Sequence, residues 1–188
     1  MGYYDIDDIL AEGTRFPCRF NYEIPGLGYL EGNPGKPISK HSKLELPLWM
    51  VHLLAVVGAQ SGDINDTEEP LPFVELLPPD LFAPRVLNAI KSGAASLDLH
   101  AISPYFYTLA ERWATLFSDK ELSQVLKDML LERGQEINNY AVSVSLHSNQ
   151  GQTNESAVFL QMLDEFEKQI YRDANVNCKE MKKWLAMK

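Results

Sequence analysis

Histidines and paired carboxylates are the side chains of this sequence that could perform acid–base chemistry or hold a metal ion. The acidic pairs Asp7-Asp8 and Glu68-Glu69 stand among polar residues, where a solvated acidic run is the ordinary interpretation. The sequence lacks the motifs of phosphate loops, dinucleotide-binding folds, zinc proteases and nucleophile elbows. No two of the four histidines have the spacing of metal ligands: His41, His52, His100 and His147.

A catalytic site assembled from distant residues is the alternative that these residues leave open. Asp98 and His100 are two positions apart, so on a helix they would point to different faces and form no dyad by themselves. A small helical hydrolase or transferase could draw on both of them and on Glu132. Such an enzyme requires a deep pocket in which these polar groups converge.

Three residues are unusual for the pattern around them and point to protein contacts. Arg133 falls within the apolar stripe of a predicted helix, where a guanidinium must be paired or must emerge at a boundary with another chain. We expect it to face a partner. Trp184 and Leu185 extend the apolar face of the last helix almost to the C-terminus, where a chain end is usually frayed unless it docks. We expect a partner interface there too, with docking on the chain's own helices as the alternative.

Composition and charge restrict the class of protein. The chain has 188 residues, 45% of them hydrophobic and 23% charged, which is an ordinary globular composition. A net charge of −9 argues against a protein that binds nucleic acid by neutralising phosphates. The distant Cys18 and Cys178 predict neither a disulfide scaffold nor a zinc site. Because the sequence has no apolar stretch of 18 residues and no secretory signal, we expect an intracellular protein without a membrane span.

Glycine and proline divide the chain into two parts. Six of the 11 glycines and five of the 11 prolines precede Leu48, and none of the prolines follows Pro104. In the first part, apolar residues alternate with others from Phe16 to Ile24, which predicts a half-buried strand, and Pro17 suggests an edge strand. A second strand is expected over 27–31 and a short helix over 5–11.

The second part predicts helices over 48–58 and 84–93, from Ser103-Pro104 to Phe117, from Ser118 to Val144, and from Thr153 or Asn154 to the C-terminus. Ser118 and Glu121 have the spacing of a capping box. We therefore predict a mainly α protein. A small β-rich domain over 1–46 precedes a five-helix bundle over 47–188.

Several ordered sequence blocks resemble one known family. These blocks are residues 3–10, 16–18, 24–30, 43–49, 74–79 and 97–100, followed by the aromatic run 105–107. In this order they are similar to GINS-complex subunits of the third "partner of Sld five" type, in their short fungal form. The likeness extends over about residues 1–186 and is weakest at 59–70 and 146–156.

The resemblance implies a small β-rich domain followed by a larger helical domain. It also implies a non-catalytic scaffold subunit without cofactors. Together with three other GINS subunits, such a chain forms a heterotetramer. This tetramer joins the minichromosome-maintenance ATPase ring and a RecJ-like cofactor in the CMG helicase, which acts in initiation and elongation of DNA replication in the nucleus. By position, Leu46, Pro47, Leu48 and Trp49 would join the two domains as structural residues.

Overall fold

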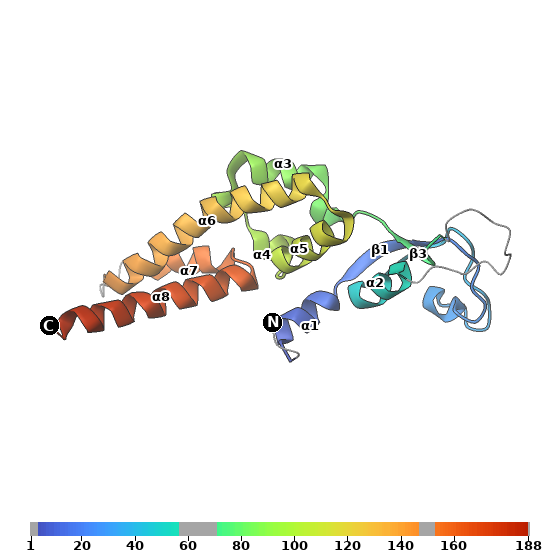
Figure 1. The fold of residues 1–188 in the computed structure, drawn as a ribbon, viewed down its shortest axis with the longest axis horizontal. Coiled ribbons are helices and arrows are strands. Elements are labelled where there is room, and N and C mark those ends of the chain that lie inside the picture. The colour runs from blue at the N-terminus through green and yellow to red at the C-terminus, as the bar shows by residue number, and fades with distance from the viewer. Residues whose placement is uncertain (1–3, 57–70, 147–152, 188) are drawn as a thin grey trace. The chain divides into compact units, whose positions relative to one another are not determined.

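The chain forms two compact units, Met1–Asp80 and Leu81–Lys188, called unit 1 and unit 2 below. A computed structural model describes residues 4–56, 71–146 and 153–187 (Figure 1). The loop predicted over 59–70 lies outside the described residues. The described residues of unit 1 form the β-sheet, two α-helices and a 3-10 helix, whereas all described regular structure after Phe82 in unit 2 is helical. The predicted fold class, mainly α with a small β-rich N-terminal part, is confirmed.

A three-stranded antiparallel sheet forms the centre of unit 1. Its strands β1 (Arg15–Phe20), β2 (Lys43–Pro47) and β3 (Val74–Leu76) are ordered β2-β1-β3. The alternation predicted for the first strand is confirmed, because Phe16, Cys18 and Phe20 are buried and the residues between them are not.

The prediction that Pro17 marks an edge strand is wrong, since β1 is the central strand. The pairing with the short β3 begins at Cys18, which lies opposite Leu76. Pro17 is therefore one residue beyond that ladder, where its missing N–H leaves no gap in the pairing. Its carbonyl accepts a hydrogen bond from the Leu77 amide at 2.9 Å.

Two helices accompany the sheet of unit 1. Helix α1 (Ile6–Glu12) begins after Asp5, whose carboxylate accepts a hydrogen bond from the Asp7 amide as an N-cap. Helix α2 (Leu48–Val56) follows β2 directly. The second strand predicted over 27–31 is instead a 3-10 helix, η1 (Gly28–Glu31). Its buried Gly28 donates to the Lys36 carbonyl, so this segment bonds to a neighbouring turn rather than to the sheet.

The core of unit 1 combines side chains of the sheet with side chains of α2 and of the turns. Its buried members are Cys18, Phe20, Ile38, Leu46, Val51 and Val74. Cys18 Sγ donates to the Leu44 carbonyl at 3.2 Å, and burial raises the pKa of this thiol to about 11. Both cysteines of the chain are buried and unbridged.

The predicted domain boundary between 46 and 47 is not where the chain divides. Leu46 and Leu48 are buried at the β2–α2 junction, and α2 supplies Val51 to the core of unit 1. Residues Leu46, Pro47, Leu48 and Trp49 therefore lie within unit 1 instead of connecting two domains. The physical reason is that the sheet needs α2 to cover it, so the division falls after Asp80.

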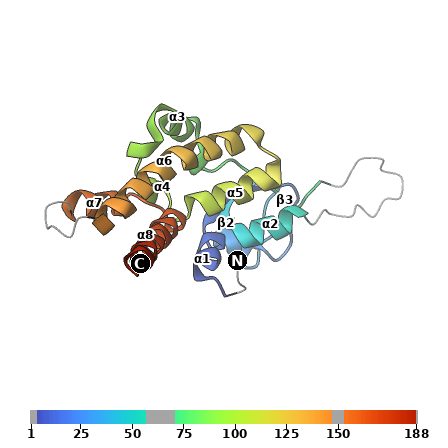
Figure 2. The same ribbon diagram turned by 60° about the vertical axis from the view of Figure 1, so that its left-hand side comes forward.

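Unit 2 is a set of helices arranged around one long helix, α6 (Lys120–Leu146). Figures 1 and 2 show α6 with α3 on one side and α8 on the other. The helices of unit 2 are α3 (Pro84–Gly93), α4 (Leu99–Ile102), α5 (Phe106–Phe117), α6, α7 (Thr153–Gln161) and α8 (Glu165–Ala186). Short 3-10 helices, η2 (Asp80–Phe82) and η3 (Ala94–Ser96), flank α3.

The predicted start of α6 is displaced by one residue. Ser118 does not cap this helix but ends α5 in the left-handed conformation, with φ of 51°. Asp119 is the capping residue instead, and its carboxylate accepts a hydrogen bond from the Leu122 amide at 2.9 Å. The stripe that follows is buried as predicted at Leu122, Val125 and Met129.

The last predicted helix is interrupted. Residues 162–164 separate α7 from α8, and Asp164 begins α8 by accepting a hydrogen bond from the Glu167 amide at 2.8 Å. Leu163 is buried in the break, where it packs in a cluster with Ile137 and Phe159. The interruption thus places an acidic residue inside unit 2.

Candidate protein interface

The residues proposed for a catalytic site serve local structure instead. Asp98 caps α4 by accepting a hydrogen bond from the Ala101 amide at 2.9 Å. Glu132 accepts one from the Ala95 amide at 3.2 Å, and His100 Nδ1 lies 3.4 Å from Lys168 Nζ. The groove of about 380 Å³ that Glu132 borders contains neither Asp98 nor His100. The three residues therefore do not meet in this groove.

The described part of the chain has neither a cluster of metal ligands nor a membrane-spanning helix. In residues 4–56, 71–146 and 153–187, no three His, Cys, Asp or Glu side chains gather as a metal site would require. None of the described helices combines the length and apolarity needed to cross a bilayer.

Arg133 lies at the centre of a buried ionic network in unit 2. Its side chain has 0% exposure, as has that of its partner Glu167 on α8. Arg133 Nε donates to Glu167 Oε1 at 2.6 Å, and Nη2 donates to Oε2 at 2.8 Å, which is the bidentate geometry of a strong arginine–carboxylate pair. Arg133 Nη1 also donates to the carbonyls of Ala94 and Leu97 at 2.7 and 2.8 Å.

Two further residues complete this network. Tyr107 Oη donates to Glu167 Oε1 at 3.0 Å. Asp164 accepts hydrogen bonds from the Tyr107 amide at 3.1 Å and from the Glu167 amide at 2.8 Å. The ion pair and these bonds connect α5, α6, α8 and the segment around η3. The four side chains Tyr107, Arg133, Asp164 and Glu167 are called the ionic network below.

The structure corrects the expectation that Arg133 faces a partner chain. A side chain without exposed surface cannot contact another protein in this conformation. A guanidinium in an apolar stripe must either pair with a carboxylate or emerge at a boundary with another chain. Here Arg133 pairs with Glu167 of the same chain. Sequence reasoning missed Glu167 and Asp164, although Asp164-Glu165-Phe166-Glu167 has the spacing of a helix-start motif.

Burial and charge shift the pKa values of this network. Burial raises the pKa of Asp164 to about 6, against the opposing effect of its two backbone hydrogen bonds. Burial also raises the pKa of the Tyr107 hydroxyl, and the Glu167 carboxylate adds to the effect. For Arg133, burial would lower the pKa, but the hydrogen bonds and charge of Glu167 outweigh it and raise the pKa.

Because the pKa of Asp164 is higher in the folded chain than in the unfolded chain, protonation of this carboxyl should stabilise the folded state. The stabilisation is complete below the unfolded pKa of 3.8 and is lost as the pH rises through about 6. Lowering the pH from about 7.5 to about 5.5 should therefore increase the unfolding free energy of the native chain by about 1 kcal/mol relative to Asp164→Asn. Urea denaturation of both proteins at the two pH values measures this difference. An unchanged difference would contradict the shift.

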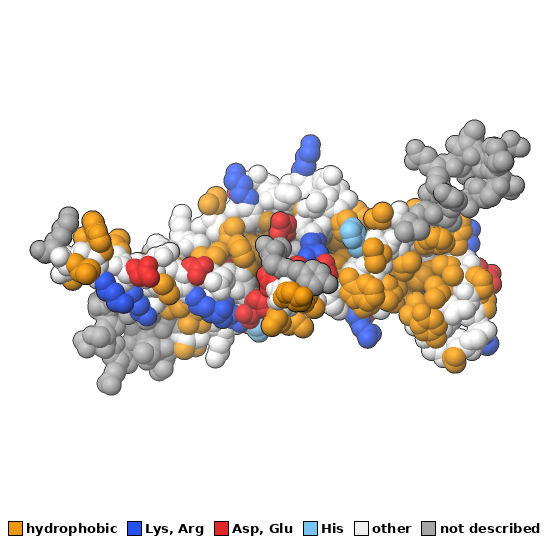
Figure 3. Space-filling model, turned by 60° about the horizontal axis from the view of Figure 1, so that its bottom comes forward, with side chains coloured by type: hydrophobic (Ala, Val, Ile, Leu, Met, Phe, Trp, Pro, Cys, Tyr) orange, Lys and Arg blue, Asp and Glu red, His pale blue; other side chains and the backbone are white. Residues whose placement is uncertain are grey.

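Unit 1 exposes apolar side chains on both of its helices. On α1, Ile6, Ile9 and Leu10 are exposed at the spacing of one helix face. On α2, Trp49, Leu53 and Val56 are exposed at a similar spacing. These six residues are called the N-terminal apolar stripes below, and Figure 3 shows hydrophobic side chains gathered on unit 1.

Trp49 therefore differs from its predicted role as a buried structural residue. It is 47% exposed, whereas its neighbours Leu46 and Leu48 are buried. Helical spacing explains the difference, because Val51 packs in the core of unit 1 and Trp49, two positions before it, lies on the opposite side of α2.

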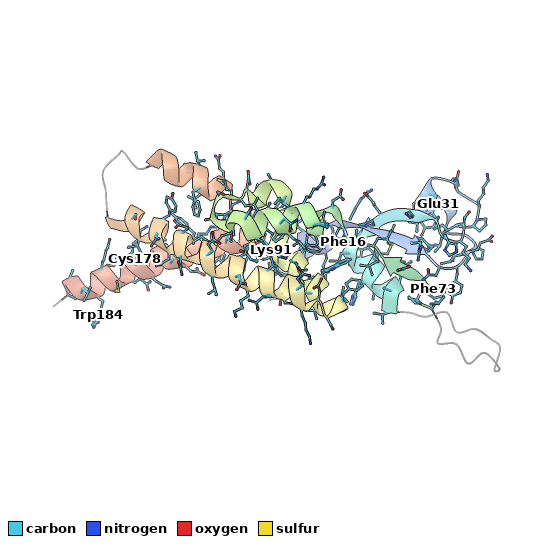
Figure 4. The ribbon with its side chains drawn as sticks, turned by 90° about the horizontal axis from the view of Figure 1, so that it is seen from above. Phe16, Glu31, Phe73, Lys91, Cys178 and Trp184 are labelled. Atoms are coloured by element: carbon cyan, nitrogen blue, oxygen red, sulfur yellow. The ribbon has the colours of Figure 1, made fainter. Side chains whose placement is uncertain are left out.

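The end of α8 carries the second exposed apolar group, formed by Met181, Trp184 and Leu185. Trp184 is 61% exposed and Leu185 is 55% exposed. Figure 4 shows Trp184 near the end of α8, beyond Cys178. These three residues are called the C-terminal apolar tip. Exposed apolar groups of this kind on a soluble protein often mark surfaces that bind other proteins.

Comparison with known proteins identifies the family. The sequence model described as "PSF3 N-terminal domain" matches residues 4–56, and that described as "GINS complex protein helical bundle domain" matches residues 81–186. A Kluyveromyces lactis protein named "DNA replication complex GINS protein PSF3" is 85% identical over 188 residues, which is 100% of both chains.

Proteins of the same name from Saccharomyces cerevisiae and Eremothecium gossypii are 50% and 53% identical. The alignment covers 100% of both chains for the first and 99% of both for the second. The two family models match the two units separately, and the relatives match the chain from end to end. This chain therefore belongs to the PSF3 family of GINS-complex proteins.

Proposed function

We propose that this chain is a non-catalytic scaffold subunit of a GINS heterotetramer that acts in chromosomal DNA replication in the nucleus. The observation that carries the proposal is the full-length similarity to relatives named as GINS proteins of the DNA replication complex. Within the tetramer, the partners are the three other GINS subunits. The tetramer in turn joins the minichromosome-maintenance ATPase ring and the RecJ-like cofactor in the CMG helicase, during both initiation and elongation.

The exposed apolar surfaces support a scaffold role. The N-terminal apolar stripes and the C-terminal apolar tip lie on separate units, so the chain has two surfaces with which to bind neighbours. Interfaces of permanent complexes are large and rich in apolar side chains. Trp184 and Leu185 are the residues that we assign to a subunit interface, because aromatic and leucine side chains are effective anchors when a partner covers them.

Charge is consistent with this division of labour. A chain of net charge −9 is unsuited to neutralise the phosphates of DNA. In a helicase assembly, this subunit would therefore hold other proteins together, and basic surfaces of other chains would contact the nucleic acid.

Co-expression with the three other subunits tests the proposal. Native mass measurement of the purified material should give one complex with a single copy of each subunit. Addition of the ATPase ring and the RecJ-like cofactor should then produce the larger assembly. A chain that remains outside the tetramer under these conditions would refute the proposed function.

Truncation of the C-terminal apolar tip should weaken assembly without unfolding the chain. Trp184→Ala combined with Leu185→Ala should reduce affinity for the other subunits by at least about tenfold, since central anchors contribute roughly 2 kcal/mol or more. The chain's own stability should change by about 0.5 kcal/mol or less, because both side chains are exposed. Competition for tetramer formation against the unmodified chain measures the affinity.

Leu131→Ala is the matched control for this prediction. Leu131 is an exposed leucine on α6 that belongs to neither the N-terminal apolar stripes nor the C-terminal apolar tip, so its loss should leave assembly unchanged. If the double variant assembles as well as this control, Trp184 and Leu185 do not belong to the subunit interface.

A further inference from the structure

A groove between α3 and α6 of unit 2 is separate from both apolar surfaces described above. It has a volume of about 380 Å³. Buried apolar side chains form its floor: Ile90 and Ala94 from the α3 side, and Val125 and Met129 from α6. Lys91 of α3, labelled in Figure 4, also belongs to the lining.

The rim of the groove is acidic. Glu121, Asp128 and Glu132 of α6 border it, and Lys91 is the basic residue of the lining. Lys91 is already engaged, because its Nζ lies 2.8 Å from Glu121 Oε1. The lining has no basic residue left to balance Asp128 and Glu132, so it carries a net negative charge.

The hydrogen bonds of these two carboxylates come from uncharged groups. Both oxygens of Asp128 accept from Gln124 Nε2 at 2.9 Å, and Glu132 accepts from the Ala95 amide. In the described part of the chain, no ion pair with a cation is found for either residue. Asp128 and Glu132 are also one helical turn apart, and Glu136 follows one turn later. Like charges at this spacing destabilise a helix by about 0.2–0.5 kcal/mol per pair, so a cation brought from outside would be favourable.

We propose that the α3–α6 groove, on the assembled tetramer, binds a segment of a further protein outside the tetramer in which Lys or Arg side chains flank an apolar side chain. The basic side chains pair with Asp128 and Glu132, and the apolar side chain covers the floor at Val125 and Met129. Charge complementarity selects this occupant, since the acidic rim repels phosphates and acidic peptides. The inference rests on the proposed function, because the groove is expected to bind this segment while the chain is part of the tetramer.

The test uses the assembled tetramer and a fluorescent peptide of about ten alternating lysine and leucine residues. Tetramer formation is first scored by native mass, before the peptide is added. The tested variant combines Asp128→Asn with Glu132→Gln, which removes two charges and preserves side-chain shape. Fluorescence anisotropy should show that this variant binds the peptide about fivefold to tenfold more weakly than the native tetramer. That loss corresponds to two ion pairs of up to about 1 kcal/mol each.

Two controls isolate the groove from the overall charge of the chain. Glu45→Gln combined with Glu111→Gln removes the same charge from exposed positions elsewhere and should leave peptide binding unchanged. A peptide with serine in place of leucine should bind more weakly to the native tetramer, because it cannot cover the apolar floor.

The outcomes separate the groove from the proposed function. A native tetramer that forms but does not bind the peptide overturns the groove and leaves the scaffold role standing. Equal binding by the native tetramer and the groove variant overturns it as well, as does equal binding of the serine peptide. If the groove variant no longer enters the tetramer, the α3–α6 surface is an intersubunit contact and the inference is wrong. Failure of the native chain to form a tetramer contradicts the proposed function itself.

Discussion

Replacement of Arg133 by alanine should lower the unfolding free energy by about 3–5 kcal/mol. The substitution leaves the Glu167 carboxylate buried without its cation, and removal of one partner from a buried ion pair carries a penalty of this size. The carbonyls of Ala94 and Leu97 lose their donor at the same time. Urea denaturation of the native and variant chains measures the effect.

Arg172→Ala is the control for this prediction. Arg172 is an exposed arginine of α8, so its truncation should change stability by about 0.5 kcal/mol or less. A double-mutant cycle with Glu167→Gln should also show strong coupling, with the double variant less destabilised than the sum of the single variants. If Arg133→Ala and Arg172→Ala have the same unfolding free energy, the ionic network does not stabilise unit 2.

Replacement of Gly28 by alanine should destabilise unit 1 by about 3 kcal/mol. A Cβ atom at this position would lie 2.5 Å from the Asn33 carbonyl oxygen and 2.9 Å from the Lys36 carbonyl carbon, too close for either atom to stay in place. Both obstacles are backbone atoms, which no rotamer change can move, so the turn over residues 28–36 must shift. Hydrogen exchange of the β1 amides should report the loss as decreased protection.

Gly35 provides the comparison for Gly28. It has φ of +83°, but a Cβ atom there would meet nothing within 4 Å. Gly35→Ala should therefore cost only the strain of the left-handed conformation, about 1–2 kcal/mol. Equal protection of β1 in the two variants would mean that the close approach at Gly28 is not a constraint.

The sequence predicted the helical half of the chain well because proline leaves a clear signal. The absence of proline after Pro104 correctly indicated helices, and Pro84 with Gly93 gave the bounds of α3. The alternation from Phe16 to Phe20 likewise gave β1 and its buried face. These are local patterns, so they do not depend on which element packs against which.

Features that depend on tertiary contacts were predicted poorly. The role of Arg133 is decided by Glu167, a residue on another helix that lies 34 positions along the chain. The place of Trp49 depends on which side of α2 covers the sheet. The segment of η1 is not a strand because Gly28 bonds to the neighbouring turn at Lys36. Periodicity within one segment contains none of this information. The exposed apolar surfaces could not be predicted for the same reason. Whether Trp184 is exposed depends on how the helices of unit 2 pack, which periodicity does not show.

The two unbridged cysteines have a practical consequence for tracking this subunit in its assembly. Cys18 lies in the core of unit 1 with a pKa of about 11, so almost none of it is thiolate near neutral pH, and Cys178 is buried in α8. Maleimides and other thiol-directed dyes react through the thiolate at accessible positions. A cysteine introduced on the surface should thus be labelled far faster than either native thiol, which allows a single fluorophore to be attached without first removing the endogenous ones.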